Sequence, residues 1–178
     1  MSETSTRAHQ ESVTVEASPE ALYDLVSDVT RTGEWSPVCT WCRWEDEDEA
    51  GQVGAWFTGH NEVPGRTWET RSKVVAAERG RRFAWTVGGH LVRWGFEITP
   101  TDAGTVLTET WEFLPGGIAY FQQTYGEDAQ AQIADRTDQA LLGIPRTLAA
   151  IKKIAESTTG QAARPGNTRP ATGPGTQS

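Results

Sequence analysis

The sequence predicts an α+β protein in which an antiparallel sheet carries its helices on one face. Three observations support this prediction. Alternating apolar and polar residues fill most of residues 12–113, turns with glycine or proline separate these strand-like runs, and an amphipathic helical pattern then extends from Ile133 to Ile154. The 178 residues have the length of a single domain.

Local residue choices justify each predicted element in order. Residues 12–17 alternate as a strand does, and Ser18-Pro19-Glu20 then provides an N-cap, a first-turn proline and an acid for a short helix that Gly33 ends. Residues 38–113 are predicted to form five or six strands joined by hairpin turns. In the long helix that follows, Pro145 is expected to introduce a kink or to loosen one backbone hydrogen bond.

The folded domain is predicted to span residues 12–157. Residues 1–11 are polar and are predicted to form a disordered N-terminus, and the proline- and glycine-rich residues 158–178 are predicted to form a disordered tail. The formal net charge of −8 argues against nucleic acid as a partner. Because no apolar run approaches about 18 residues and the N-terminus has no signal-peptide core, we expect no stable membrane insertion and a cytoplasmic protein.

The eight tryptophans all lie between Trp35 and Trp111. Strand parity places four of them on the interior face of the sheet: Trp68, Trp85, Trp94 and Trp111. Two interpretations of these rings stay open. They fill the core, or they form an aromatic wall around a pocket for a hydrophobic, ring-containing ligand.

Glu109 has the same interior parity, between Leu107 and Trp111 on the last strand. A carboxyl group in that position loses its hydration, and its pKa is expected to rise. Such a group is suited to act as a general acid or base, or as a hydrogen-bonding handle for a ligand hydroxyl. The alternative is a structural ion pair, for which Arg136 on the long helix is the expected partner.

The only two cysteines form the motif Cys39-Thr-Trp-Cys42. A redox-active motif of this kind is expected at a helix start in a βαβ unit, and a zinc site needs two further ligands. Neither context is present in the sequence. We therefore expect two small residues on a strand, with no metal and no cofactor.

Aromatic residues also occur between the last strand and the long helix. Tyr120, Phe121 and Tyr125 follow the glycine pair Gly116-Gly117. They are expected either to gate the mouth of a cavity or to hold this segment against the helix.

Six stretches of the chain together form a pattern that resembles a known superfamily: residues 17–28 (ASPEALYDLVSD), 33–35 (GEW), 53–57 (VGAWF), 79–85 (RGRRFAW), 104–108 (GTVLT) and 151–155 (IKKIA). Over residues 12–157 the pattern is similar to the START-like, or Bet v 1-like (SRPBCC), superfamily, and within it to the polyketide cyclase/dehydrase branch. The resemblance implies a helix-grip fold. In that fold a curved antiparallel sheet of six to seven strands wraps around a long C-terminal helix, two short helices follow the first strand, and an apolar cavity is enclosed.

The aromatase/cyclases of this branch carry an arginine, a tryptophan and a tyrosine in the cavity. The resemblance places these positions near Val74, Thr70 and Cys42, so the sequence departs from the aromatase pattern at all three. Arg71 lies on the opposite parity to Trp68 and does not replace the arginine.

The predicted function is therefore the binding of a small hydrophobic molecule, aromatic or polyketide- or lipid-like, by a carrier or binding module. Two alternatives remain: a cyclase- or dehydratase-type enzyme that uses Glu109 as acid or base, and a protein-interaction module with no small ligand. The candidate ligand-binding residues are Phe57, Trp68, Thr70, Ser72, Trp85, Trp94, Phe96, Trp111, Tyr120 and Arg136.

Overall fold

A seven-stranded antiparallel sheet forms the framework of the protein, in the order β1-β7-β6-β5-β4-β3-β2. The computed structural model describes residues 7–162. The strands are β1 (Arg7–Val15), β2 (Cys39–Trp44), β3 (Trp56–Val63), β4 (Arg66–Glu78), β5 (Arg82–Val87), β6 (Val92–Thr101) and β7 (Gly104–Phe113). Strands β2 to β7 are each hydrogen-bonded to the next along the chain, as hairpin turns dictate, and the first strand closes beside the last.

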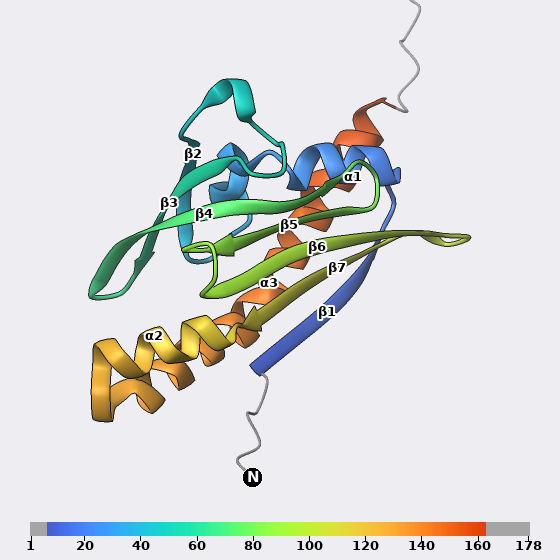
Figure 1. Cartoon of the computed structure of the whole chain (residues 1–178). Helices are drawn as coiled ribbons and strands as arrows, with labels where there is room; N and C mark the ends of the chain where they lie inside the picture. The colour runs from blue at the N-terminus through green and yellow to red at the C-terminus, as the bar shows by residue number, and fades with distance from the viewer. Residues whose placement is uncertain (1–6, 163–178) are drawn as a thin grey trace, which may run out of the picture.

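The helices gather on one side of this sheet, except for η2, which lies in the connection that projects between β2 and β3 (Figure 1). They are α1 (Pro19–Val26), η1 (Val29–Glu34), η2 (Glu47–Glu49), α2 (Pro115–Tyr125), η3 (Gly126–Asp128) and α3 (Ala129–Ala162). The long helix α3 continues through Pro145 and contacts β1, β7, α1 and α2. The predicted α+β helix-grip architecture is thereby confirmed, including the two short helices after the first strand, of which the second is a 3-10 helix.

The hydrophobic core lies between the sheet and the inner stripe of α3. Leu22 of α1, Phe83 of β5, Leu107 of β7 and Ile151 of α3 are completely buried in it. Burial of such side chains contributes about 1.5–3 kcal/mol each to folding, so this layer fixes how α3 lies on the sheet. Within residues 7–162, no helix is both long enough and apolar enough to cross a bilayer.

The described elements extend beyond the predicted domain bounds, residues 12 and 157, at both ends. Residues 7–11 belong to β1, because their backbone pairs with residues 109–113 of β7, which needs no apolar side chains. Residues 158–162 continue α3, where the hydroxyls of Thr158 and Thr159 donate hydrogen bonds to carbonyls one turn earlier. The predictions for residues 1–6 and 163–178 lie outside the described residues.

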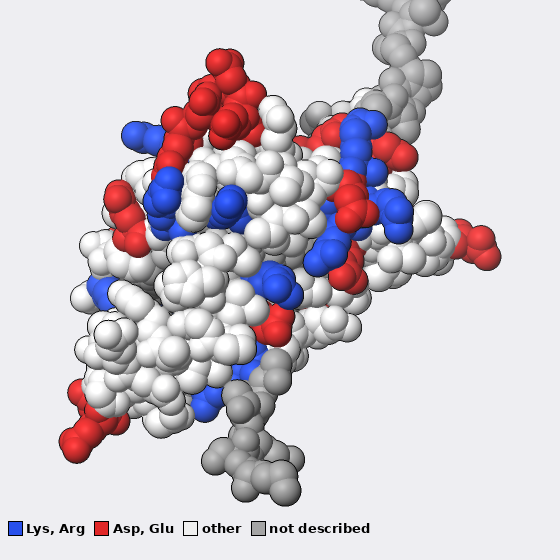
Figure 2. Space-filling view, viewed as in Figure 1, with Lys and Arg blue, Asp and Glu red and all other residues white. Residues whose placement is uncertain are grey.

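An acidic tip projects from the connection between β2 and β3 (Figure 2). It contains Glu45 to Glu49, and η2 forms its centre. Asp46 caps η2, and Glu45 instead reaches back to the guanidinium of Arg71 at 2.6 Å. The tip is exposed to solvent, as expected for a charged hairpin connection.

Candidate functional site

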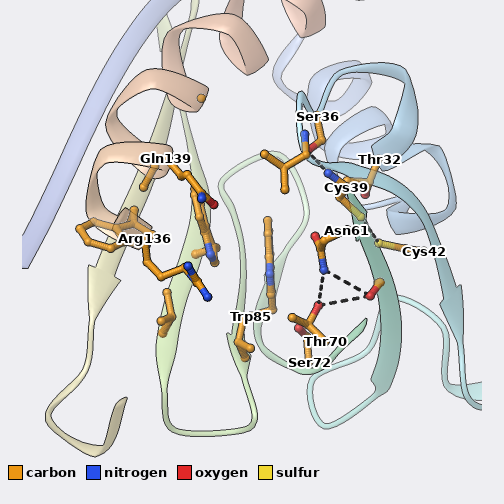
Figure 3. A pocket seen from close by; sticks show the side chains of 18 of the residues that line it. Thr32, Ser36, Cys39, Cys42, Asn61, Thr70, Ser72, Trp85, Arg136 and Gln139 are labelled. Atoms are coloured by element: carbon orange, nitrogen blue, oxygen red, sulfur yellow. Dashed lines mark hydrogen bonds between the residues drawn. The ribbon is translucent and has the colours of Figure 1, made fainter. Parts of the chain in front are cut away.

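A cavity of about 480 Å³ opens between the inner face of the sheet, η1 and the helices α2 and α3. Because side chains alternate between the two faces of a sheet, the cavity is lined mainly from one face of β3 to β7. All ten predicted ligand-binding residues and Glu109 line it. In Figure 3, Arg136 and Gln139 of α3 lie across the cavity from Asn61, Thr70 and the cysteines, with Trp85 between them.

Three tryptophans form a continuous row across neighbouring strands. Trp85 lies opposite Trp94 in the sheet register, and Trp94 lies opposite Trp111. The ring centres of Trp94 and Trp111 are 6.4 Å apart in an edge-to-face arrangement. Trp111 is only 3% exposed and belongs to the core, whereas Trp85 and Trp94 are partly buried and pack against it. All three rings also line the cavity, so the row serves both of the functions that the sequence left open.

The mouth of the cavity combines aromatic and cationic groups. The guanidinium groups of Arg66 and Arg136 lie 4.5 and 5.8 Å from the ring centre of Trp68, within the range of cation–π attraction. On α2, Phe121 packs edge-to-face on Phe113 at 5.2 Å, while Tyr120 remains 47% exposed. Phe121 therefore holds α2 against the sheet, and Tyr120 lines the cavity from a position with access to solvent.

Glu109 is the one deeply buried acid of this wall among the described residues. It is 4% exposed, lies between Phe96 and Glu11 in the register, and its Oε2 has no hydrogen-bond partner. Burial, assisted by the negative charge of Glu11, raises the pKa of Glu109 to about 8. The carboxyl group is therefore mostly protonated at pH 7 and presents an O–H donor.

The alternative ion pair between Glu109 and Arg136 is wrong. Arg136 instead pairs with Asp135, its neighbour on α3, and lies over the rings of Trp68 and Phe121. No salt bridge of Glu109 occurs within residues 7–162. Helix α3 places the guanidinium of Arg136 beside the aromatic rings at the cavity mouth, so no positive charge compensates the carboxyl group of Glu109.

His9 and Glu11 are site neighbours that the sequence reasoning missed. His9 Nε2 lies 2.8 Å from Glu11 Oε1, and the two residues pair in register with Trp111 and Glu109. Both are partly buried, with side chains 30% and 39% exposed. The sequence does carry a signal for this placement. The alternation of residues 12–17 continues toward the N-terminus, and it places Glu11 and His9 on the same face as the interior residues of this strand.

A polar wall on β3 and β4 completes the site. The amide Nδ2 of Asn61 donates a hydrogen bond of 3.3 Å to Thr70 Oγ1, and Ser72 is buried beside them (Figure 3). Cys39 and Cys42 adjoin this wall, with their sulfur atoms 3.4 Å apart. In the part of the chain that the structure describes, no cluster of three or more His, Cys, Asp or Glu residues is arranged to hold a metal ion.

Comparisons with known proteins agree with this geometry. Residues 7–142 match the family described as polyketide cyclase / dehydrase and lipid transport. The chain is 46% identical to the Polyketide_cyc-like protein Cgl2372 of Corynebacterium glutamicum, whose solution NMR structure superposes with a TM-score of 0.65 over 90% of this chain and 98% of that one. No curated protein matches the chain.

Two further structures share the fold at low identity. The di-domain ARO/CYC StfQ of the steffimycin biosynthetic pathway is 18% identical, with a TM-score of 0.63 over 87% of this chain and 52% of that one. NE0264 of Nitrosomonas europaea is 14% identical, with a TM-score of 0.62 over 86% of this chain and 96% of that one. With the family match covering most of the described residues, the chain belongs to the polyketide cyclase/dehydrase and lipid transport family.

Proposed function

We propose that the protein binds a small hydrophobic, ring-containing molecule in its cavity and serves as a carrier or binding module. The observation that supports this most directly is the row of Trp85, Trp94 and Trp111, which all line the cavity, Trp85 and Trp94 with only partly buried rings. A volume of about 480 Å³ lies in the range of small-molecule sites. The family description, which includes lipid transport as well as cyclases, is consistent with such a ligand.

Polar groups at two places would orient the ligand. The neutral carboxyl group of Glu109 offers a hydrogen bond to a carbonyl or hydroxyl oxygen at the aromatic row. Asn61 and Thr70 provide amide and hydroxyl groups on the opposite wall. A ligand with a flat apolar body and oxygen substituents at both ends satisfies these groups, as expected for an aromatic or polyketide-like molecule.

Uptake of a fluorescent hydrophobic probe tests the proposal. We expect a saturable complex in which the probe quenches tryptophan emission, because three rings lie at the cavity wall. Ala140→Leu on α3 places a larger side chain into the cavity and is expected to weaken probe binding about tenfold, or about 1.4 kcal/mol. Ala149→Leu, at an exposed position of the same helix, is the matched control and should retain the wild-type affinity.

The proposal fails if a saturating probe causes no quenching, or if Ala140→Leu and Ala149→Leu have the same affinity. Native mass spectrometry of the freshly purified protein provides an independent readout. A retained small molecule that is lost in Ala140→Leu would identify the ligand directly.

A second candidate function, a dehydratase or cyclase activity, is favoured by one observation. Glu109 is a neutral acid at the wall, and its Oε2 has no hydrogen-bond partner among the described residues. It could protonate a leaving hydroxyl, so that the C–O bond breaks and water departs, while the Glu109 carboxylate that forms takes up the α-proton of the substrate as the C=C bond forms and the acid is regenerated. Because Val74, Thr70 and Cys42 stand where the resemblance places the aromatase residues, such chemistry would depend on Glu109.

Glu109→Gln separates the two candidates. For an enzyme, we expect the loss of water from a cyclic β-hydroxyketone to fall at least about 100-fold in this variant, since general acids contribute on that scale. Probe affinity should change little, because the amide retains the shape and the donor. Undiminished turnover in Glu109→Gln would remove Glu109 as the acid, and absence of turnover in the wild type would leave the carrier function alone.

A further inference from the structure

The two cysteines converge on the cavity wall although they lie three positions apart in a strand. In a regular strand, residues at this spacing face opposite sides. Here the pairing of β2 with β3 contains a β-bulge between Cys39 and Trp41, which shifts the register by one residue. Both thiols consequently line the cavity, and their sulfur atoms are 3.4 Å apart.

The surrounding backbone holds this arrangement. Ser36 Oγ accepts hydrogen bonds from the backbone N–H groups of Cys39 at 2.8 Å and Val38 at 3.2 Å, which fixes the entry into β2. Gly59 lies opposite Cys42 in the register. A Cβ atom at Gly59 would lie 3.3 Å from the sulfur of Cys42 and 3.5 Å from that of Cys39, so the absence of a side chain leaves room for both.

The two thiols are chemically unequal. The hydrogen bond from Cys39 lowers the pKa of Cys42, against the opposing effect of burial, and the hydroxyl of Thr32 contributes in the same direction. The same hydrogen bond, followed by burial, raises the pKa of Cys39. We therefore expect Cys42 to act as the nucleophile of the pair and Cys39 as the thiol beside it.

We propose that Cys39 and Cys42 form a peroxide-reactive dithiol site that closes to an intramolecular disulfide in the cavity wall. The sulfur of Cys42 attacks a peroxide oxygen, an S–O bond forms as the O–O bond breaks, and the displaced oxygen leaves as water after it takes up a proton. The sulfur of Cys39 then attacks the sulfenic sulfur of Cys42. The S–S bond forms, the S–O bond breaks, and the leaving hydroxide takes the Cys39 proton as a second water, so two electrons pass from the thiols to the peroxide.

The position of the pair favours a small neutral oxidant. Cys42 is only 6% exposed, and its sulfur is reached through a cavity that is lined mainly by apolar groups. Hydrogen peroxide can enter such a space without a large desolvation penalty, whereas a charged peptide disulfide cannot. The site does not depend on the ligand proposed above, because it requires only an accessible cavity wall.

The test treats the reduced full-length protein with hydrogen peroxide. Because the chain contains only two cysteines, every thiol lost belongs to this pair. We expect both thiols to disappear together and the intact mass to fall by two hydrogens. On a non-reducing gel the oxidised protein should run as a monomer, as the reduced protein does. Dithiothreitol should restore both thiols. Cys39→Ser should stop at a sulfenic acid on Cys42 that dimedone traps, and Cys42→Ser should react at least roughly tenfold more slowly.

Three results would overturn the proposal: two thiols that remain open to alkylation after peroxide treatment, a product that is a disulfide-linked dimer, or equal oxidation rates for Cys39→Ser and Cys42→Ser. The first two are measured on the wild-type protein, so they do not depend on how well a variant folds. None of them involves ligand binding, and failure here is distinguishable from failure of the proposed function.

Discussion

Replacement of Glu109 by glutamine is expected to abolish most of a pH dependence of stability that the wild-type protein shows between pH 5 and pH 9. The pKa of Glu109 is about 8 in the folded protein, against 4.5 for an ordinary glutamate. Between these two values the folded protein keeps a proton that the unfolded chain has released. The folded state therefore binds more protons, and the free energy of unfolding falls as the pH rises.

The expected change is large. The stability that the neutral carboxyl group contributes is fully present below about pH 4.5, declines above it and is lost once the pH passes about 8. At about 1.4 kcal/mol per pKa unit, the total amounts to roughly 3–5 kcal/mol. Glutamine is neutral throughout this range, so Glu109→Gln should be more stable than the wild type by about this amount at pH 9.

Urea unfolding at pH 5, 7 and 9 measures the effect. Glu112→Gln is the matched control, because Glu112 lies on the same strand with the opposite parity and pairs with Arg93 at 3.2 Å. This variant leaves Glu109 in place, so its free energy of unfolding should change with pH as that of the wild type does. Parallel pH profiles for the wild type and Glu109→Gln would contradict a buried neutral acid, and with it the donor that the proposed site requires.

The inner face of the sheet could be predicted from the sequence because side-chain direction in a strand has a period of two. Once the hairpin turns were located, Trp85, Trp94 and Glu109 had to share one face, and a slip of one residue would have moved all of them outward. Their presence at the cavity wall follows from that parity. The direct opposition of the tryptophans depends on turn lengths, which the alternation alone does not specify.

Two parts of the site depend on information that local pattern does not carry. Residues 7–11 have almost no apolar side chains, and they form a strand because β7 offers its edge to their backbone. The convergence of Cys39 and Cys42 depends on a bulge, which has no reliable signature in a strand of six residues. The direction of the Arg136 side chain is also absent from the sequence pattern. In the structure it pairs with Asp135 and lies over Trp68, away from an ion pair with Glu109.

The second large effect is expected when one aromatic ring of the core and one of the cavity wall are truncated separately. Phe83 is fully buried, contacts Tyr23 and Trp85, and does not line the cavity. Phe83→Ala should lower the free energy of unfolding by about 3–5 kcal/mol, because a packed ring leaves an internal void. The folded fraction should bind the hydrophobic probe with nearly unchanged affinity.

Trp94→Ala should have the opposite effects, a small loss of stability and a large loss of probe affinity. Its ring lies edge-to-face on Trp111 but also faces the cavity, so its removal enlarges a space that already exists instead of creating one in the core. We expect a smaller loss of stability, roughly 1–2 kcal/mol, and a probe affinity reduced at least about tenfold. Calorimetric titration provides the affinity without relying on tryptophan emission, and urea unfolding provides the stability.

The crossed comparison decides what the tryptophan row does. If Trp94→Ala loses as much stability as Phe83→Ala while the probe affinity stays at the wild-type value, the row only fills the core and the cavity is not the ligand site. If affinity and stability separate as expected, the cavity face of Trp94 contributes binding energy that folding does not need. Because the three rings adjoin in the register, the same pair of measurements on Trp85→Ala would then show how far the ligand contact extends along the row.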